Sequence, residues 1–236
     1  MGDTHIDPAV FKAQQREQWS NVAQGWRRRW AAFEQGAQPL SDWMMNLAHI
    51  APGQRVLDVA TGIGEPAMTA ARQVGPSGWG LMFFHDPVGA LARFRNSLVP
   101  RGWLAAAVWG SPERVPMISL PFSVLSSELG QPPSLPSGPS PFALSEPTRL
   151  EQVLRDAGFA NVQSEPFTVT FEFASVDELL GHLGEVSAPI RMIMATSSPE
   201  YQAEFWKKLA DAAVPFTDAD GMIRLSNDCL VAAGQR

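Results

Sequence analysis

Apolar residues recur with a helical period in some segments of the chain and form short continuous runs in others. Aromatic residues between positions 8 and 34 lie near a helical spacing, and residues 40–49 form a second such segment, so we expect two N-terminal helices. Continuous apolar runs at 55–60, 80–84 and 103–109 have the length of strands buried on both faces. Helical segments separate these runs, and this alternation is typical of a parallel sheet built from βαβ units.

The remaining sequence falls into two parts. Residues 111–147 are rich in proline and serine, which favours an irregular excursion. Residues 148–236 alternate again and add a helical insert. We expect helices at 148–157, 176–195 and 200–213, and strands at 162–173 and 223–233. The prediction is therefore one domain of four parts: N-terminal helices (1–50), a sheet core (51–110), the excursion (111–147) and a C-terminal α/β part (148–236).

The first helix has two features that each allow two interpretations. Its aromatic residues, Trp26 among them, usually indicate core packing, and the alternative is a lid over a substrate pocket. The cluster Arg27-Arg28-Arg29 is more typical of a solvated helix face than of an anion site.

Composition narrows the class of protein. The chain has 236 residues, of which 45% are hydrophobic and 18% are charged, so it can bury a continuous core. Lysine and arginine number 18 against 24 aspartate and glutamate residues, which gives a net charge of -6. Because no broad cationic surface is available for phosphates, a nucleic-acid partner is not expected.

Cysteine and histidine usage argues against metal and disulfide chemistry. Cys229 is the sole cysteine, which excludes an internal disulfide, and the 4 histidines show no metal-ligand spacing. The first residues lack the charged and then apolar pattern of a leader, and no run of about 18 apolar residues occurs. We therefore expect a cytoplasmic protein with neither a metal nor a membrane partner.

The segment from Asp58 to Gly64, Asp-Val-Ala-Thr-Gly-Ile-Gly, is the local pattern with a chemical interpretation. Glycines after a buried strand let the backbone turn sharply and approach a ligand, and the following helix offers unpaired N–H groups. A carboxylate at the strand end can bind an ammonium group. Alone, such a pattern is also compatible with a plain strand-to-helix turn.

Three sequence blocks, in this order along the chain, allow a more specific interpretation. They are 56–67 (VLDVATGIGEPA), 79–87 (WGLMFFHDP) and 98–109 (LVPRGWLAAAVW). Together they resemble the class I S-adenosylmethionine-dependent methyltransferase family, in particular its ubiquinone and menaquinone C-methyltransferase branch, although Ala60 stands where many members have glycine. The resemblance covers most of the chain.

The resemblance implies a cofactor, S-adenosylmethionine, and residues that would contact it. Those at its methionine end would be Asp58, Ala60, Thr61, Gly62 and Gly64. Phe84, His85 and Asp86 would border the sulfonium and the substrate, which makes His85 and Asp86 the candidate catalytic residues. Loop bracing and strand capping are the alternative roles for all of these side chains.

The second and third strand-helix units of that family, with the acidic residues that hold ribose and adenine, have no counterpart here. Only sixteen positions separate Gly64 from Gly80, whereas one βαβ unit needs roughly 30 residues. The sequence therefore predicts an α/β fold with a truncated, mostly parallel Rossmann-like sheet. The unfavourable left-handed crossover is avoided if the helix moves to the opposite face, if the later strand takes the vacated side, or if a partner chain supplies strands. Because the third arrangement also covers the exposed apolar edge, we expect an intertwined or strand-exchanged homodimer.

Two functions follow from these observations. The first is methyl transfer from S-adenosylmethionine to a small apolar acceptor, which relies on alignment of the reactants more than on acids and bases. The second is a cofactor-free binding scaffold or a repurposed, esterase-like hydrolase, because the adenosine half of the site is missing. No Gly-x-Ser-x-Gly elbow or Ser-x-x-Lys pair identifies a hydrolytic nucleophile.

Overall fold

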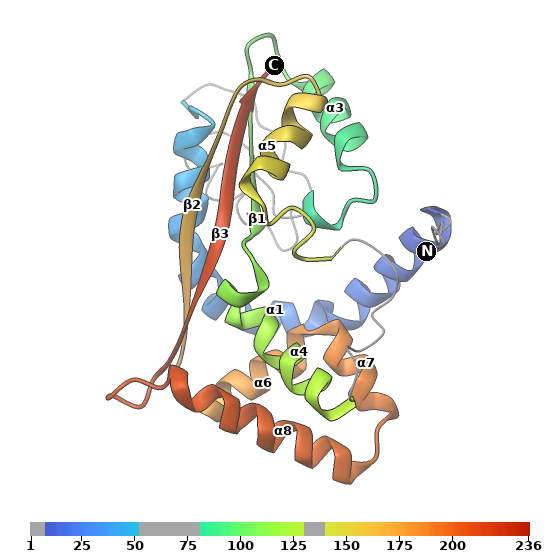
Figure 1. Ribbon diagram of the computed structural model, residues 1–236, viewed down its shortest axis with the longest axis vertical. Coiled ribbons are helices and arrows are strands. Elements are labelled where there is room, and N and C mark those ends of the chain that lie inside the picture. Colours follow the sequence, from blue (N-terminus) through green and yellow to red (C-terminus); the bar gives the residue numbers. More distant parts are fainter. Residues whose placement is uncertain (1–7, 52–80, 130–139) are drawn as a thin grey trace. The chain divides into compact units, whose positions relative to one another are not determined.

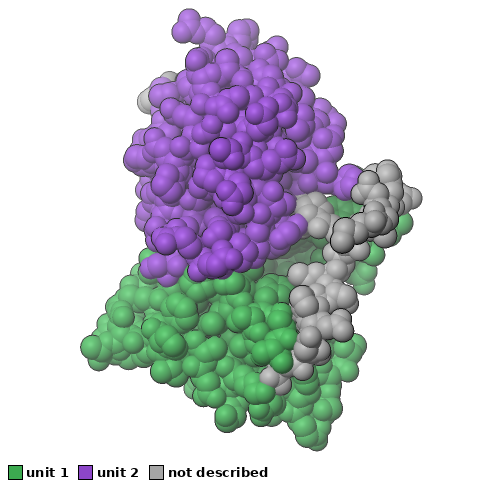
Figure 2. Space-filling model, viewed as in Figure 1, with its two compact units in different colours: residues 1–35, 116–138, 170–225 green, residues 36–115, 139–169, 226–236 purple. Residues whose placement is uncertain are grey.

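The computed structural model of the protein describes residues 8–51, 81–129 and 140–236 (Figure 1). The chain divides into two compact units, which Figure 2 shows in different colours. Unit 1 comprises residues 1–35, 116–138 and 170–225, and unit 2 comprises residues 36–115, 139–169 and 226–236. The single domain of four parts expected from the sequence stays a prediction.

A single helix, α1 (Pro8–Leu47), replaces the two N-terminal helices expected from the sequence. The expectation of a break is wrong because Pro39, which lies inside α1, removes only one backbone donor. The apolar side chains that follow it stabilise the helix: Leu40 and Met44 are fully buried. The boundary between the two units falls within α1, after Gln35.

The apolar run expected as a strand at 80–84 is a short 3-10 helix, η1 (Leu81–Phe83), over its described part. Leu81 and Met82 are buried all the same. An apolar run without alternation indicates burial on all sides but does not determine the backbone conformation, which explains the error. The helical segment expected between the apolar runs at 80–84 and 103–109 is confirmed as α3 (Pro87–Ser97).

The run at 103–109 is confirmed as β1 (Trp103–Trp109), but the Pro- and Ser-rich excursion is not irregular throughout. After the 3-10 turn η2 (Pro112–Arg114) it contains α4 (Pro116–Leu129), which includes Pro121. Val124 and Leu125 of α4 are buried, so apolar packing in unit 1 stabilises a helix that the proline content disfavours.

A Schellman motif connects α5 (Pro147–Asp156) to β2 (Ala160–Phe173). Gly158 adopts a φ of 89°, a left-handed conformation that glycine adopts without steric cost. The Phe159 N–H then donates to the Leu154 carbonyl over 3.1 Å. Both elements agree with the sequence-based expectation.

The helical insert consists of α6 (Val176–Val186), α7 (Ala188–Thr196) and α8 (Pro199–Ala213), followed by the 3-10 turn η3 (Val214–Phe216). The sequence predicted one helix over 176–195, whereas α6 and α7 separate at Ser187. Proline in the first turn of α7 explains the break, because that position favours a helix start. Ser175 and Ser198 cap α6 and α8 by accepting backbone N–H groups.

The described sheet has the strand order β1-β3-β2, where β3 is Ile223–Gln235. β1 and β3 are antiparallel, with Trp103 opposite Gln235 and Trp109 opposite Cys229. The expectation of a mostly parallel sheet is therefore wrong for the described residues. Apolar runs report that strands are covered on both faces, whereas the connections between strands set their direction.

Side-chain partners show that β2 and β3 also run in opposite directions. Asn161 Nδ2 donates to Gln235 Oε1 over 2.9 Å, and Arg224 Nε donates to Glu172 Oε1 over 2.8 Å. The N-terminal end of each strand thus lies beside the C-terminal end of the other. β3 is the central strand, and its residues 229–234 are all buried.

Each unit has its own buried apolar side chains. In unit 1 they include Leu179, Phe205 and Leu209, and in unit 2 they include Leu150 and Val231. Within unit 2, α3 contacts α5 and β1 contacts η1. None of the helices among the described residues is long and apolar enough to cross a membrane.

Candidate functional site

Most of the residues predicted to contact a cofactor lie outside the described part of the chain. They are Asp58, Ala60, Thr61, Gly62 and Gly64, within 52–80. Their cofactor-binding role stays a prediction.

Phe84, His85 and Asp86 are described, and they form the connection between η1 and α3. The ring of Phe84 is half-buried, with its centroid 6.0 Å from that of Phe94. His85 is exposed. Asp86 is the N-cap of α3, and its Oδ1 accepts the Gly89 N–H over 2.8 Å. Asp86 thus caps a helix, whereas the sequence-based alternative was the capping of a strand, and its part in chemistry stays a prediction.

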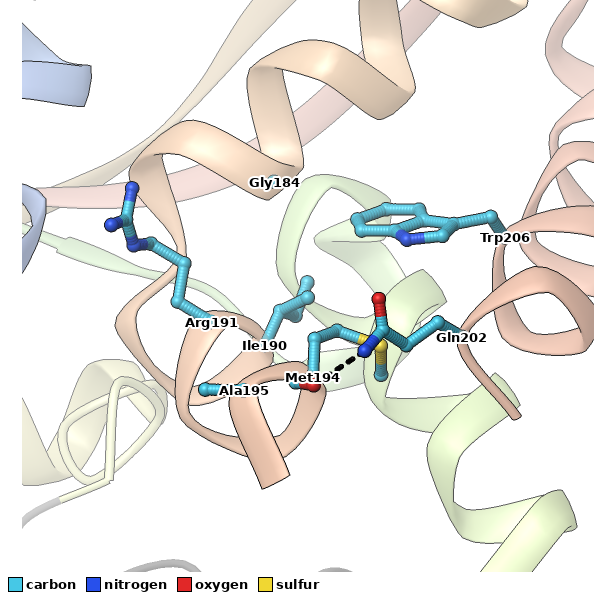
Figure 3. A pocket seen from close by; sticks show the side chains of 7 residues that line it. All are labelled: Gly184, Ile190, Arg191, Met194, Ala195, Gln202 and Trp206. Atoms are coloured by element: carbon cyan, nitrogen blue, oxygen red, sulfur yellow. Dashed lines mark hydrogen bonds between the residues drawn. The ribbon is translucent and has the colours of Figure 1, made fainter. Parts of the chain in front are cut away.

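A cavity of about 310 Å³ lies within the helical insert of unit 1. Three helices contribute to it, α6 through Gly184, α7 through its apolar face and Arg191, and α8 through Gln202 and Trp206 (Figure 3). The residues that line it are Gly184, Ile190, Arg191, Met194, Ala195, Gln202 and Trp206. The volume lies at the lower end of the range typical of small-molecule sites.

Packing and hydrogen bonds fix the α8 side of this cavity. Gln202 Nε2 donates to the Met194 carbonyl over 2.9 Å and to the Ser197 carbonyl over 3.1 Å. These two bonds orient the carboxamide and leave its oxygen as the acceptor. The Trp206 ring packs edge-on against the fully buried Phe205, with centroids 4.9 Å apart. Both side chains are thus preorganised.

Arg191 is the charged residue of the cavity. Its side chain is exposed at the rim, and no ion pair to it is found within the parts of the chain that the structure describes. Figure 3 shows its guanidinium and the Trp206 ring on opposite sides of Gly184. The cavity therefore combines apolar walls, one cation and one fixed amide oxygen.

A second group of polar residues lies where α1 packs against α6. Glu185 Oε1 accepts from Arg29 Nη2, and Glu185 Oε2 accepts from Arg28 Nε, each over 2.7 Å. These hydrogen bonds, from Arg28 and Arg29, hold the pKa of Glu185 below its usual value. Two members of the arginine cluster therefore join helices, and Arg27 remains exposed.

His182 on α6 is buried beside this group. Its side chain is 2% exposed, and neither ring nitrogen has a hydrogen-bond partner among the described residues. The imidazole packs edge-on against Phe173, with centroids 5.3 Å apart. Burial, reinforced by the charge of Arg29, lowers the pKa of His182 to about 4, so the ring is neutral at pH 7.

The described residues contain no group of three or more His, Cys, Asp or Glu side chains placed to hold a metal ion. Burial, together with the charge of Asp228, raises the pKa of the Cys229 thiol. That cysteine is therefore a protonated core residue on β3 and not a nucleophile.

The sequence predicted the helices of the insert but none of the residues that line the cavity. Met194 and Trp206, which line it, are apolar residues for which core packing is the default explanation. Arg191 was missed, yet the sequence contains a signal for it: it is the one charge in the apolar run of residues 188–195. Gln202 and Gly184 have no comparable signal, because their roles depend on how α6 and α8 meet.

Comparison with known proteins gives one local sequence match and several distant structural ones. No family model matches the chain. It is 56% identical over 46 residues to "Sterol methyltransferase-like 3" of Botryococcus braunii. Those residues are 19% of this chain and 12% of that relative, so the chain matches only a small part of the relative's length.

Two solved structures illustrate the distant likeness. A phosphoethanolamine N-methyltransferase 2 of Haemonchus contortus, in complex with S-adenosylhomocysteine, has a TM-score of 0.46 and 13% identity, covering 87% of this chain and 56% of that one. The YcgJ protein of Bacillus subtilis has a TM-score of 0.48 and 12% identity, covering 83% of this chain and 97% of that one. Similarity at this level assigns neither a family nor an activity.

Proposed function

We propose that the chain is a methyltransferase that uses S-adenosylmethionine and acts on a small, largely apolar acceptor. The proposal rests on the pattern from Asp58 to Gly64, in a chain that shares 56% identity over 46 residues with a sterol methyltransferase-like protein. Bound S-adenosylmethionine would supply an electrophilic methyl group. In this proposal the residues of the chain bind and orient the reactants and exclude water from them.

The proposed role of each residue follows from its chemistry. Asp58 would pair with the amino group of the cofactor, and Gly62 and Gly64 would let the backbone approach it. Phe84 is half-buried and could border the same site with its ring. The carboxylate of Asp86 already accepts a backbone N–H, which fits a positioning role better than that of a general base.

Calorimetric titration of the full chain with S-adenosylhomocysteine tests the proposal. We expect saturable binding that Asp58→Asn weakens by about 10-fold or more, since hydrogen bonds to charged groups contribute about 1.5–3 kcal/mol. Asp42→Asn removes an exposed carboxylate on α1 and should leave the affinity unchanged. Absence of binding heat at high protein concentration would overturn the proposal.

A cofactor-free binding scaffold is the second candidate. It is favoured by the sixteen positions from Gly64 to Gly80, which leave no room for the units that would hold ribose and adenine. The same titration separates the two candidates, because only the first predicts binding. An esterase-like activity is not supported by a Gly-x-Ser-x-Gly elbow or a Ser-x-x-Lys pair in the sequence, and turnover of a chromogenic ester by the purified chain would be the evidence for it.

We further propose that the protein is a homodimer, in strand-exchanged form. A sheet without its second and third strands would leave an apolar edge, and a second copy of the chain would cover that edge. Light scattering coupled to gel filtration should give twice the mass of one chain. A monomer at micromolar concentration would contradict this part of the proposal.

A further inference from the structure

We propose that the cavity between α6, α7 and α8 binds a small aromatic carboxylic acid, with its ring against Trp206 and its carboxylate on Arg191. This site goes beyond the proposed methyl transfer, because it requires neither S-adenosylmethionine nor any residue of 52–80. All its lining residues belong to unit 1.

The walls of the cavity favour an apolar, planar body. Ile190 is fully buried and Met194 is 8% exposed, so both present fixed apolar surface. The indole of Trp206 offers a ring for offset or edge-on stacking, and the Met194 thioether makes favourable contacts with aromatic rings. At about 310 Å³ the space suits a ligand of one or two fused rings rather than a peptide or a lipid chain.

Gly184 makes room for the indole of Trp206, which forms one wall of the cavity. A Cβ at Gly184 would lie 3.3 Å from Cη2 of Trp206, so even alanine would press on the indole. A larger side chain would have to occupy the cavity or displace the ring.

The charge of the ligand follows from the two polar groups. Arg191 is exposed at the rim with no ion-pair partner among the residues that the structure describes, and a guanidinium binds a carboxylate through two parallel hydrogen bonds. The oxygen of Gln202 would repel an anion, because the hydrogen bonds that Nε2 donates to the Met194 and Ser197 carbonyls fix the orientation of the carboxamide. The carboxylate therefore belongs at the Arg191 end, with the ring extending toward Trp206 (Figure 3).

A titration with 2-naphthoate, in the absence of S-adenosylmethionine, tests this inference on the full chain. The anisotropy of naphthalene fluorescence reports binding, and 2-naphthalenemethanol provides a neutral ligand of similar shape. We expect the acid to bind about 10-fold more tightly than the alcohol, a difference of about 1.4 kcal/mol, because only the acid can form a bidentate pair with the guanidinium. Arg191→Gln should remove that difference, and Gly184→Val should weaken both ligands.

Arg27→Gln is the matched control, because Arg27 is also exposed and lies in the same unit. Unchanged affinity in this variant, together with loss in Arg191→Gln, would support the site. Equal losses in both variants, equal binding of acid and alcohol, or no binding at millimolar 2-naphthoate would each overturn it. If Gly184→Val fails to fold, Arg191→Gln decides the matter, since it alters only an exposed side chain. A failed S-adenosylhomocysteine titration would leave this inference untouched.

Discussion

Gly25 on α1 lies directly against the backbone of Glu185 on α6, so that a Cβ added to Gly25 would overlap the Glu185 carbonyl oxygen. The two helices of unit 1 can approach this closely because Gly25 presents no side chain at the crossing. The Glu185 carboxylate meanwhile accepts hydrogen bonds from Arg28 and Arg29 one turn further along α1. Close backbone contact and ion pairs thus stabilise the same crossing.

Gly25→Ala should therefore destabilise the protein, although alanine is the better helix former. Overpacking costs about 1–3 kcal/mol, which exceeds the gain of about 1 kcal/mol in helix propensity. Urea unfolding followed by circular dichroism measures the change.

Gly181→Ala on α6 is the control for this prediction. A Cβ there would meet only the end of the flexible Arg29 side chain, at 3.0 Å. We expect it to be neutral or stabilising by up to about 1 kcal/mol. Equal losses in the two variants would show that the α1–α6 crossing is not where the structure places it.

The two arginines that bind Glu185 should differ in their contribution to stability. Arg29 is 28% exposed and donates through both Nε and Nη2, whereas Arg28 is 59% exposed and donates through Nε. We expect Arg29→Ala to cost about 1 kcal/mol and Arg28→Ala a few tenths, because solvent screens exposed pairs. Unfolding free energies at low and high salt measure both, and the reverse ranking would contradict the geometry.

His182 should make the protein less stable in acid. Its pKa is about 4 in the folded state and near 6.5 when unfolded, so between these pH values only the unfolded chain takes up the proton. Stability from this group is therefore lost as pH falls from 6.5 to 4, by up to about 3 kcal/mol, and is constant above 6.5. Arg29, Glu185 and Glu178 are the charged groups that act on the ring.

His182→Leu should remove this part of the pH dependence and leave buried apolar volume in its place. The measurement is the free energy of unfolding at several pH values between 4 and 7.5. Leu209→Ala, at another buried position of unit 1, is the control: it removes no titrating group and should lower stability without changing the slope. A slope that survives in His182→Leu would mean that other groups dominate the acid response.

Asp86 should contribute to stability as a helix cap. Asp86→Ala removes the acceptor for the Gly89 N–H and should cost about 1 kcal/mol, whereas Asp86→Ser keeps an acceptor and should cost little. Thermal unfolding followed at 222 nm measures both.

The N-cap of α5 provides a comparison at a site without such a bond. Glu146 makes no capping hydrogen bond through its side chain, so Glu146→Ala should be nearly neutral. Should Asp86→Ala be as mild as Glu146→Ala, the capping interpretation of Asp86 would be wrong.

The sequence was most informative where one local signal determines one structure. β1 could be predicted to the residue because an apolar run is bounded by Gly102 and Gly110. The continuity of α1 through Pro39 could not be predicted, since burial of its apolar face outweighs the loss of one donor. Strand direction was misjudged because the apolar run in β1 and the alternating pattern in β3 report burial and not orientation.

The candidate cavity, too, could be predicted from the sequence only in part. An isolated arginine in the apolar run of α7 could have indicated a polar group at an apolar site. The free volume itself depends on Gly184 meeting Trp206 across two helices, which no local pattern encodes. The predicted cofactor contacts Asp58 to Gly64 stay predictions, because they lie outside the described residues.

The ion pair between Glu172 on β2 and Arg224 on β3 brings together two points that are 52 positions apart in the chain. The segment between them leaves and re-enters the sheet at neighbouring positions. Lengthening a loop whose ends are already joined costs little additional closure entropy, about 0.6 kcal/mol for each doubling. The sequence and length of α6, α7 and α8 can therefore change during evolution, and new ligands can be accommodated, while the pairing of β2 with β3 at Glu172 and Arg224 is kept.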